Sequence, residues 1–230
     1  MMSFQSTDSF KYIDRGSREL MVLVPGWASD YRIFDSLDLN FNYLIPFFCS
    51  PFDFERKLLK VIRDNKISRL SFFGWSLGGL LAANFSAKFP QIVDKLILVG
   101  IRNKYPAIQL AEIRNFLKRS KKGYLSRFYS QCFSNQKTSL KFRKGLMKDY
   151  LKDLDLSFLL EGLNYLEQTE IDVSGLRVLN QVVIIQGEND KIVPLAEVKD
   201  IKDNLPQAEF ILVKGAGHAV FLEKDVAGYL

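Results

Sequence analysis

Cysteine and histidine are scarce in this chain of 230 residues, which contains two cysteines, Cys49 and Cys132, and one histidine, His218. Two scattered cysteines cannot form a disulfide framework. Together with a single histidine they do not supply the clustered ligands that a structural zinc site needs. We therefore expect no metal site, and a reducing compartment.

Long apolar runs are also missing, because no stretch reaches the roughly 18 residues that a membrane-spanning helix requires. The first twenty residues are polar and lack the central apolar region of a secretory signal. Neither a G-x-G-x-x-G motif nor a P-loop is present, which argues against a nucleotide cofactor. We expect a cytoplasmic monomer without a cofactor and without membrane contact.

The composition is that of a globular protein, with 47% hydrophobic and 25% charged residues, and the length suits one large core. The net charge of +6 is unevenly distributed. Residues 102–153 contain fourteen Lys and Arg but only three Asp and Glu. The rest of the chain contains eighteen Lys and Arg and twenty-three Asp and Glu. This basic segment is either a solvated helical face or a docking surface for an anionic partner. No helix-turn-helix, zinc-finger or RNP-type signature indicates that the partner is nucleic acid.

Apolar runs alternate with helical patterns over most of the chain. The predicted strands are Glu19–Pro25, Tyr43–Phe48, Arg69–Gly74, Lys95–Gly100, Gln181–Gly187 and Glu209–Val213, and the predicted helices are Phe54–Asp64, Leu77–Phe89 and Leu195–Asn204. Most of the strands are continuous apolar runs, which is typical of central parallel strands covered on both faces. The alternation predicts an α/β fold with a mostly parallel central sheet flanked by helices.

The alternation stops after the Lys95–Gly100 strand and resumes near Gln181. From 102 to 172 the pattern is amphipathic and helical, with no convincing strand. We interpret 102–172 as an all-helical insertion within one α/β core formed by 1–101 and 173–230. It is not an independent domain.

The sequence from Gly74 to Gly78 fits G-x-S-x-G around Ser76, directly follows an apolar strand and opens a helix. In such a sharp turn, side chains at Gly74 and Gly78 would collide across the chain. The hydroxyl of Ser76 would project at the positive end of the helix, where developing negative charge is stabilised. The pattern indicates a nucleophilic serine, and the alternative is a serine that only caps the helix.

A serine nucleophile needs a base, and His218 is the one ordinary candidate. It lies in a small-residue loop after the Glu209–Val213 strand; alone, it could equally be a packed structural histidine. The orienting acid should follow another strand, where Asp190 is the preferred candidate and Glu188 the second. Asp190 could instead cap a helix. The chain order of serine, acid and histidine is the hydrolase order.

An oxyanion needs preorganised N–H donors. We expect one from the backbone amide of Leu77, which follows Ser76. The other should come from the loop Pro25–Ser29 after the first predicted strand, at the amide of Trp27. The ring of Trp27 would then line an acyl pocket, unless it is simply a core tryptophan.

At these residues the sequence resembles the α/β-hydrolases over nearly its whole length. It resembles more closely the pimeloyl-acyl-carrier-protein methyl ester esterases of biotin synthesis. The matching motifs are Pro25-Gly26-Trp27, Gly74-Trp75-Ser76-Leu77-Gly78-Gly79, Leu160–Leu166 with Glu170–Val173, Gly187–Asp190 with Val193-Pro194, and Ala216-Gly217-His218.

The resemblance implies that the helical insertion is a lid that contacts an acidic acyl carrier protein. Arg127 and Phe128 resemble one such position, which implies carrier docking for Arg127 and substrate binding for Trp27 and Phe128. The wider docking set is Arg114, Lys118, Arg119, Lys141, Arg143 and Lys144. The phenylalanines of the insertion (Phe116, Phe128, Phe133 and Phe142) suit an extended acyl chain.

The sequence departs from that family in two places. Pro25 stands where a histidine usually precedes the glycine, and the D-x-P-G-x-G-x-S loop is replaced by a short run from Ile45 to Pro51. The implied function is a serine carboxylesterase that hydrolyses the methyl ester of pimeloyl-acyl-carrier protein and so frees the carboxylate for biotin synthesis. The alternatives are a generic short-chain carboxylesterase, a C–C hydrolase with the same residues, or a non-catalytic scaffold that binds an anionic partner.

Overall fold

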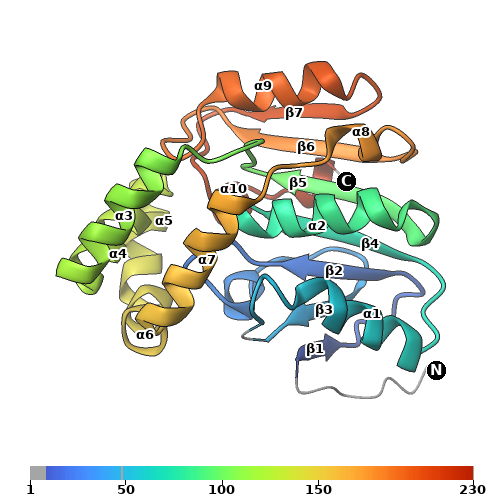
Figure 1. Cartoon of the computed structure of the whole chain (residues 1–230), viewed down its shortest axis with the longest axis horizontal. Helices are drawn as coiled ribbons and strands as arrows, with labels where there is room; N and C mark the ends of the chain where they lie inside the picture. Colours follow the sequence, from blue (N-terminus) through green and yellow to red (C-terminus); the bar gives the residue numbers. More distant parts are fainter. Residues whose placement is uncertain (1–8, 48, 230) are drawn as a thin grey trace.

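The computed structural model describes residues 9–47 and 49–229 and contains one sheet in the order β1-β3-β2-β4-β5-β6-β7. The strands are β1 (Phe10–Ile13), β2 (Leu20–Val24), β3 (Asn42–Pro46), β4 (Leu70–Trp75), β5 (Val93–Val99), β6 (Val182–Gly187) and β7 (Glu209–Val213). Strands β2 to β7 pair in parallel, and β1 pairs antiparallel with β3. The predicted α/β fold with a mostly parallel sheet is confirmed (Figure 1).

All six predicted strands are present, with ends that shift by no more than two residues. Phe48, the last residue of the predicted Tyr43–Phe48, lies outside the described residues. Strand β1 was not predicted. Its sequence, Phe-Lys-Tyr-Ile, is short and carries a lysine, which is common for an edge strand and gives a weak apolar signal.

Helices cover both faces of the sheet and one of its ends. They are η1 (Tyr31–Phe34), α1 (Phe54–Asp64), α2 (Leu77–Lys88), η2 (Pro90–Ile92), α3 (Ala107–Arg119), α4 (Lys121–Gln131), α5 (Gln136–Lys144), α6 (Leu146–Asp153), α7 (Leu156–Gln168), α8 (Val173–Leu176), α9 (Leu195–Asn204), α10 (Val220–Glu223) and η3 (Ala227–Tyr229). None of the helices within 9–47 and 49–229 combines the length and the apolar composition that a bilayer crossing needs.

Two neighbouring phenylalanines of β4 show how the faces are filled, because successive side chains on a strand point to opposite sides. Phe72 packs against Phe85 of α2, with ring centroids 5.4 Å apart. Phe73 packs against Phe221 of α10 at 5.7 Å. Both phenylalanines are fully buried, so the core lies on both faces of a central strand.

Between β5 and β6 the described chain forms helices α3 to α8 and no strand. Helices α3 to α6 gather beyond the end of the sheet to which the parallel strands point, at the left of Figure 1. Among them the rings of Phe133 and Phe142 lie 5.0 Å apart and Tyr150 is fully buried, and all three belong to the same hydrophobic cluster as the residues of the sheet.

The strand order reverses between β2 and β4. The chain leaves β2 toward β3 on one side and returns to β4 on the other, although β2 and β4 are direct neighbours with Val24 opposite Gly74. Loops that leave two such strands diverge and form a crevice at their carboxyl ends, where open α/β sheets bind ligands. This places Trp27, which follows β2, beside Ser76, which follows β4.

Candidate active site

Ser76 lies at the junction of β4 and α2 in a backbone conformation with φ of 55° and ψ of −119°, which L-residues rarely adopt. The flanking glycines make this turn possible. A Cβ at Gly74 would lie 2.6 Å from the carbonyl oxygen of Gly78, and a Cβ at Gly78 would lie 2.1 Å from that of Val24. The glycines therefore allow β2, β4 and α2 to meet closely around a serine that is only 6% exposed.

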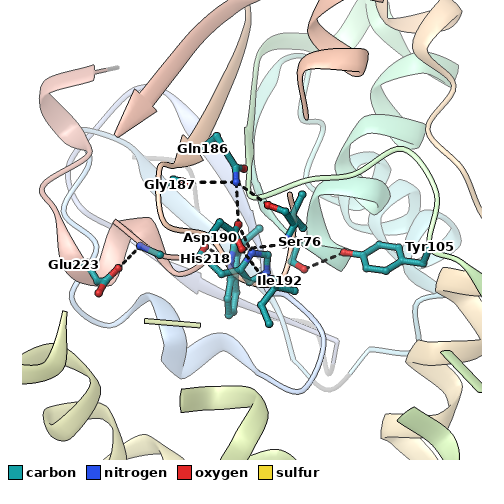
Figure 2. A network of polar contacts seen from close by, with 11 residues as sticks. Ser76, Tyr105, Gln186, Gly187, Asp190, Ile192, His218 and Glu223 are labelled. Carbon is teal, nitrogen blue, oxygen red and sulfur yellow. Dashed lines mark hydrogen bonds and ion pairs between the residues drawn. The ribbon is translucent and has the colours of Figure 1, made fainter. Parts of the chain in front are cut away.

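His218 and Asp190 form a buried pair in the loops after β7 and β6 (Figure 2). Nδ1 of the imidazole lies 2.8 Å from Oδ2 of Asp190, and the exposed fractions of the two side chains are 0% and 1%. Glu188, the second candidate acid, instead accepts a hydrogen bond from the backbone N–H of Gly215 at 2.9 Å. The structure thus brings Asp190, and not Glu188, to the histidine.

Asp190 is surrounded by hydrogen-bond donors. Its Oδ1 accepts from the backbone N–H groups of Ile192 at 2.7 Å and Val193 at 2.9 Å, and its Oδ2 accepts from Nε2 of Gln186 at 3.1 Å. Burial raises the pKa of Asp190, but the charge and hydrogen bond of His218 and the two backbone amides outweigh it and leave the pKa below 3.8. The carboxylate is therefore ionised near neutral pH and fixes the orientation of the imidazole.

The other imidazole nitrogen of His218, Nε2, is buried and has no hydrogen-bond partner among the described residues. The hydroxyl of Ser76 instead contacts the hydroxyl of Tyr105, with 3.5 Å between the two oxygens (Figure 2). Burial raises the pKa of Tyr105 to about 12, so its hydroxyl keeps its proton at neutral pH. An imidazole with Nδ1 held by a carboxylate and Nε2 unoccupied can accept a proton at Nε2.

The loop after β2 presents Trp27 and is held from several sides. The indole Nε1 of Trp27 donates to the carbonyl oxygen of Leu159 in α7 at 2.9 Å. The next residue, Ala28, has a φ of 59°, and its carbonyl oxygen accepts a hydrogen bond from the hydroxyl of Tyr129 at 2.6 Å. Leu77 is the first residue of α2, so its N–H has no partner within the helix. The two predicted oxyanion amides therefore lie at the strand reversal, that of Trp27 in the loop after β2 and that of Leu77 at the start of α2.

An apolar cavity lies beside these loops. Its wall combines Trp27 and Leu77 with residues of the short run after β3, of α1 and α2, and of α7, among them Cys49, Phe54, Leu81 and Phe158. Gly162 of α7 also lines it, and a Cβ there would lie 2.6 Å from the indole of Trp27. The short run that replaces the longer family loop thus still supplies one wall of a cavity.

The four phenylalanines that were expected to suit an acyl chain do not line this cavity. Phe128 meets the ring of Trp27 edge to face at 5.0 Å and so touches the site through the tryptophan. Phe133 and Phe142 are buried against each other within the insertion, and Phe116 is exposed. The residues of the insertion that do line the cavity are Phe158 and Gly162 of α7, which the sequence pattern does not indicate.

The basic residues of the insertion also divide into two groups. Arg114 is 18% exposed, pairs with Glu167 of α7 at 2.5 Å and also donates to Asn164. It ties α3 to α7 and is not free to meet a partner, which corrects its inclusion in the docking set. The other predicted docking residues are exposed: Lys118, Arg119, Arg127, Lys141, Arg143 and Lys144.

Other nucleophiles and metal ligands are less suitable. The described residues contain no group of three or more His, Cys, Asp or Glu side chains placed to hold a metal ion. Burial raises the pKa of the Cys49 thiol to about 11 and that of Cys132 well above its ordinary value. Both cysteines are therefore protonated at neutral pH and are poor nucleophiles.

Two residues of the site escaped the sequence analysis. Tyr105 gives no signal, because a lone tyrosine after a strand has many possible roles. Gln186 gives a weak sequence signal, because it is a polar residue in the otherwise apolar run Val-Val-Ile-Ile-Gln-Gly. In the structure its side chain is fully buried. A buried polar side chain in a strand needs partners, and Gln186 finds them in Asp190 and the carbonyl oxygen of Val193.

The sequence matches the family described as serine aminopeptidase, S33, over residues 52–225. A pimeloyl-[acyl-carrier protein] methyl ester esterase of Nitrosomonas europaea is 28% identical over 178 residues, which cover 72% of this chain and 71% of that protein. A protein of the same name from Vibrio campbellii is 24% identical over 182 residues, with 74% of this chain and 72% of that protein covered.

Solved structures resemble this chain at lower identity. An esterase from Exiguobacterium antarcticum superposes with a TM-score of 0.79 at 17% identity and covers 93% of this chain and 89% of its own. A bromoperoxidase from Bacillus anthracis superposes with a TM-score of 0.81 at 15% identity, covering 96% and 92%. The sheet order, the turn at Ser76 and the match over 52–225 agree: this chain belongs to the serine aminopeptidase S33 family of α/β-hydrolases.

Proposed function

We propose that the protein is a serine carboxylesterase in which Ser76 is the nucleophile, His218 the general base and Asp190 the acid that orients the base. The observation that carries this proposal is the buried His218–Asp190 pair, whose second imidazole nitrogen, Nε2, has no hydrogen-bond partner among the described residues. A rotation of the Ser76 side chain away from Tyr105 would bring its hydroxyl toward Nε2. Catalytic hydrogen bonds are often long or absent before substrate binds.

In the first half-reaction Nε2 of His218 accepts the proton of Ser76 as its oxygen attacks the ester carbonyl carbon. The backbone amides of Trp27 and Leu77 stabilise the oxyanion of the tetrahedral intermediate. The imidazolium then gives the proton to the departing alcohol, which leaves an acyl-enzyme. Water, activated by the same histidine, hydrolyses the acyl-enzyme and releases the carboxylate and free Ser76.

We further propose that the substrate is the methyl ester of a pimeloyl chain carried by an acyl carrier protein, and that methanol is the leaving alcohol. The names of the relatives at 24% and 28% identity support this choice. The cavity next to Trp27 and Leu77 has the apolar lining that a hydrocarbon chain needs, and at about 50 Å³ its walls would have to open to admit an extended acyl chain. The helical insertion 102–172 would act as the lid, and its exposed lysines and arginines would meet the acidic carrier.

The experiment compares hydrolysis of the carrier-bound methyl ester with that of free dimethyl pimelate, by mass spectrometry of the acid product. We expect kcat/KM to be at least about tenfold higher for the carrier-bound ester, because a docked carrier adds binding energy to the same chemistry. Equal values for the two esters would favour a generic short-chain carboxylesterase. If the protein hydrolyses neither ester, the remaining alternative is a non-catalytic scaffold that binds an anionic partner.

A further inference from the structure

The loop that carries His218 is packed directly against the turn between α4 and α5. The backbone N–H of Ala219 donates to the carbonyl oxygen of Cys132 at 3.0 Å. A Cβ at Gly217 would lie 2.8 Å from that same oxygen, so residue 217 must be small for the two segments to meet. The two residues that flank His218 are therefore in contact with the helical insertion.

One carboxylate joins these two segments. Glu223, in the last turn of α10, accepts hydrogen bonds at Oε1 from the backbone N–H groups of Ser134 at 2.8 Å and of Asn135. Its Oε2 accepts from the backbone N–H of Gly217, which immediately precedes His218 (Figure 2). One oxygen thus binds the α4–α5 turn and the other binds the histidine loop.

These contacts are more than a helix cap or a surface ion pair. Glu223 forms no ion pair with a residue that the structure describes, and all three of its donors are backbone amides. Hydrogen bonds to an ionised carboxylate are stronger than neutral ones, and they fix the positions of peptide groups. A bond to the peptide before His218 limits movement of that loop relative to Ser76.

We propose that Glu223 is a positioning residue that fixes the His218 loop against the α4–α5 turn, so that the helical insertion sets the position of the base. The inference rests on the proposed roles of Ser76 and His218. Asp190 fixes the direction of the imidazole at Nδ1, and Glu223 fixes the backbone from which the imidazole projects. A displacement of about 1 Å between reacting groups can lower a rate about 100-fold.

The test uses Glu223→Ala, which removes both acceptor oxygens, and Glu223→Gln, which keeps the size and one of them. Glu209→Gln, at an exposed carboxylate on β7, is the matched control. The substrate is a short nitrophenyl ester, and active sites are counted by intact-mass titration with a fluorophosphonate. We expect kcat per titrated site to fall about 10- to 100-fold in Glu223→Ala and less in Glu223→Gln, with KM within about threefold of the wild type.

A purely structural role would give a different result. If Glu223 served only folding, the number of titrated sites would fall while kcat per remaining site stayed at the wild-type value, and the inference would be wrong. A second pair of variants approaches the contact from the insertion: Ser134→Pro removes the N–H donor, whereas Ser134→Ala keeps it. We expect Ser134→Pro to have the lower kcat per site, and equal values would count against the inference even if Glu223→Ala did not fold.

The same titration separates this inference from the proposed function. If the fluorophosphonate labels a residue other than Ser76 in the wild type, the proposed catalytic roles fail whatever the Glu223 variants do. If Ser76 is labelled and kcat per site is unchanged in the Glu223 variants, only the inference about Glu223 fails.

Discussion

The indole Nε1 of Trp75 donates a hydrogen bond to the backbone carbonyl oxygen of His218 at 3.0 Å, across a sequence separation of 143 residues. The two rings lie 5.5 Å apart. Trp75, the last residue of β4, therefore holds the backbone of His218, and Ser76 directly follows Trp75 in the chain. The carboxyl end of β4 thus positions both the proposed nucleophile and the loop of the proposed base.

The first prediction concerns the nucleophile and the base. Replacing Ser76 or His218 by alanine should lower kcat by on the order of 10⁵- to 10⁶-fold, because members of such a triad act as a unit. Steady-state hydrolysis of a nitrophenyl ester measures this, and circular dichroism verifies that the variants fold. A Ser76→Ala variant with near-normal turnover would contradict the assignment of the nucleophile.

The second prediction distinguishes the two acidic candidates. Asp190→Asn should lower kcat by up to about 10⁴-fold, because an amide cannot hold the imidazole in the correct tautomer or stabilise its protonated form. Glu188→Gln should change kcat less than about threefold, since Glu188 bonds the backbone of Gly215 and not His218. If Glu188→Gln were the more damaging change, the orienting acid would be Glu188.

The third prediction concerns acid stability. Because the folded-state pKa of Asp190 lies below 3.8, its ionised form stabilises the fold at pH values above about 4, and this contribution is lost as the pH falls through the lowered pKa. Asp190→Asn lacks the contribution at every pH. The difference in melting temperature between the wild type and Asp190→Asn should therefore begin to shrink as the pH falls below about 5 and should go on shrinking below pH 3.8. A difference that grows as the pH falls would show that the pKa of Asp190 is raised in the folded state.

The fourth prediction concerns the wall of the apolar cavity. Gly162→Ala should lower kcat/KM by roughly tenfold, because the new methyl group meets the indole of Trp27 and displaces the residue whose amide is the proposed oxyanion donor. The melting temperature of Gly162→Ala should fall less than the clash alone implies, because alanine is more favourable than glycine in a helix by about 1 kcal/mol. Gly228→Ala is the control, since a Cβ there has no neighbour within 4 Å. Unchanged activity in Gly162→Ala would show that the cavity wall can move without affecting catalysis.

The fifth prediction concerns the basic face of the insertion. Reversing Lys141, Arg143 and Lys144 of α5 to glutamate should raise KM for the carrier-bound ester about tenfold and leave kcat nearly unchanged, because exposed charges act mainly on association. Hydrolysis of the free ester should be unaffected. Raising the salt concentration should mimic the variants, since a Debye length of about 10 Å at 0.1 M screens exposed charges. Lys199→Glu, an exposed reversal on α9, serves as the control. Equal losses on both esters would mean that the substitutions damage the insertion itself.

The strands and the residues around Ser76 were predictable because their signals are local. A continuous apolar run followed by G-x-S-x-G constrains the backbone within a few residues. Positions 74 and 78 must be glycine because a Cβ at either one would clash with neighbouring backbone atoms. The His218–Asp190 pair was predictable from chain order, because parallel strands bring their following loops to one end of the sheet.

The roles of α7 and Arg114 could not be derived from the sequence, because they depend on how helices distant in the chain pack together. Gly162 faces Trp27 over a separation of 135 residues, and no periodicity within α7 indicates that contact. Arg114 belongs to a run of basic residues that look alike in the sequence, and only the position of Glu167 distinguishes it. Glu223 is similar, since its three donors come from two loops that the sequence places about 80 residues apart.

The two ends of the insertion 102–172 lie side by side, because the backbone N–H of Ile171 donates to the carbonyl oxygen of Asn103 at 3.2 Å. A segment whose two ends are adjacent in space can be lengthened, shortened or exchanged without shifting the sheet or the turn at Ser76. If the insertion is the lid that we propose, evolution can change which substrate is admitted while it keeps the chemistry. The contact between Glu223 and the amides of Ser134 and Asn135 limits that freedom. A grafted insertion would need to present backbone N–H groups at this one turn, and insertions that omit it should give enzymes that fold but turn over slowly.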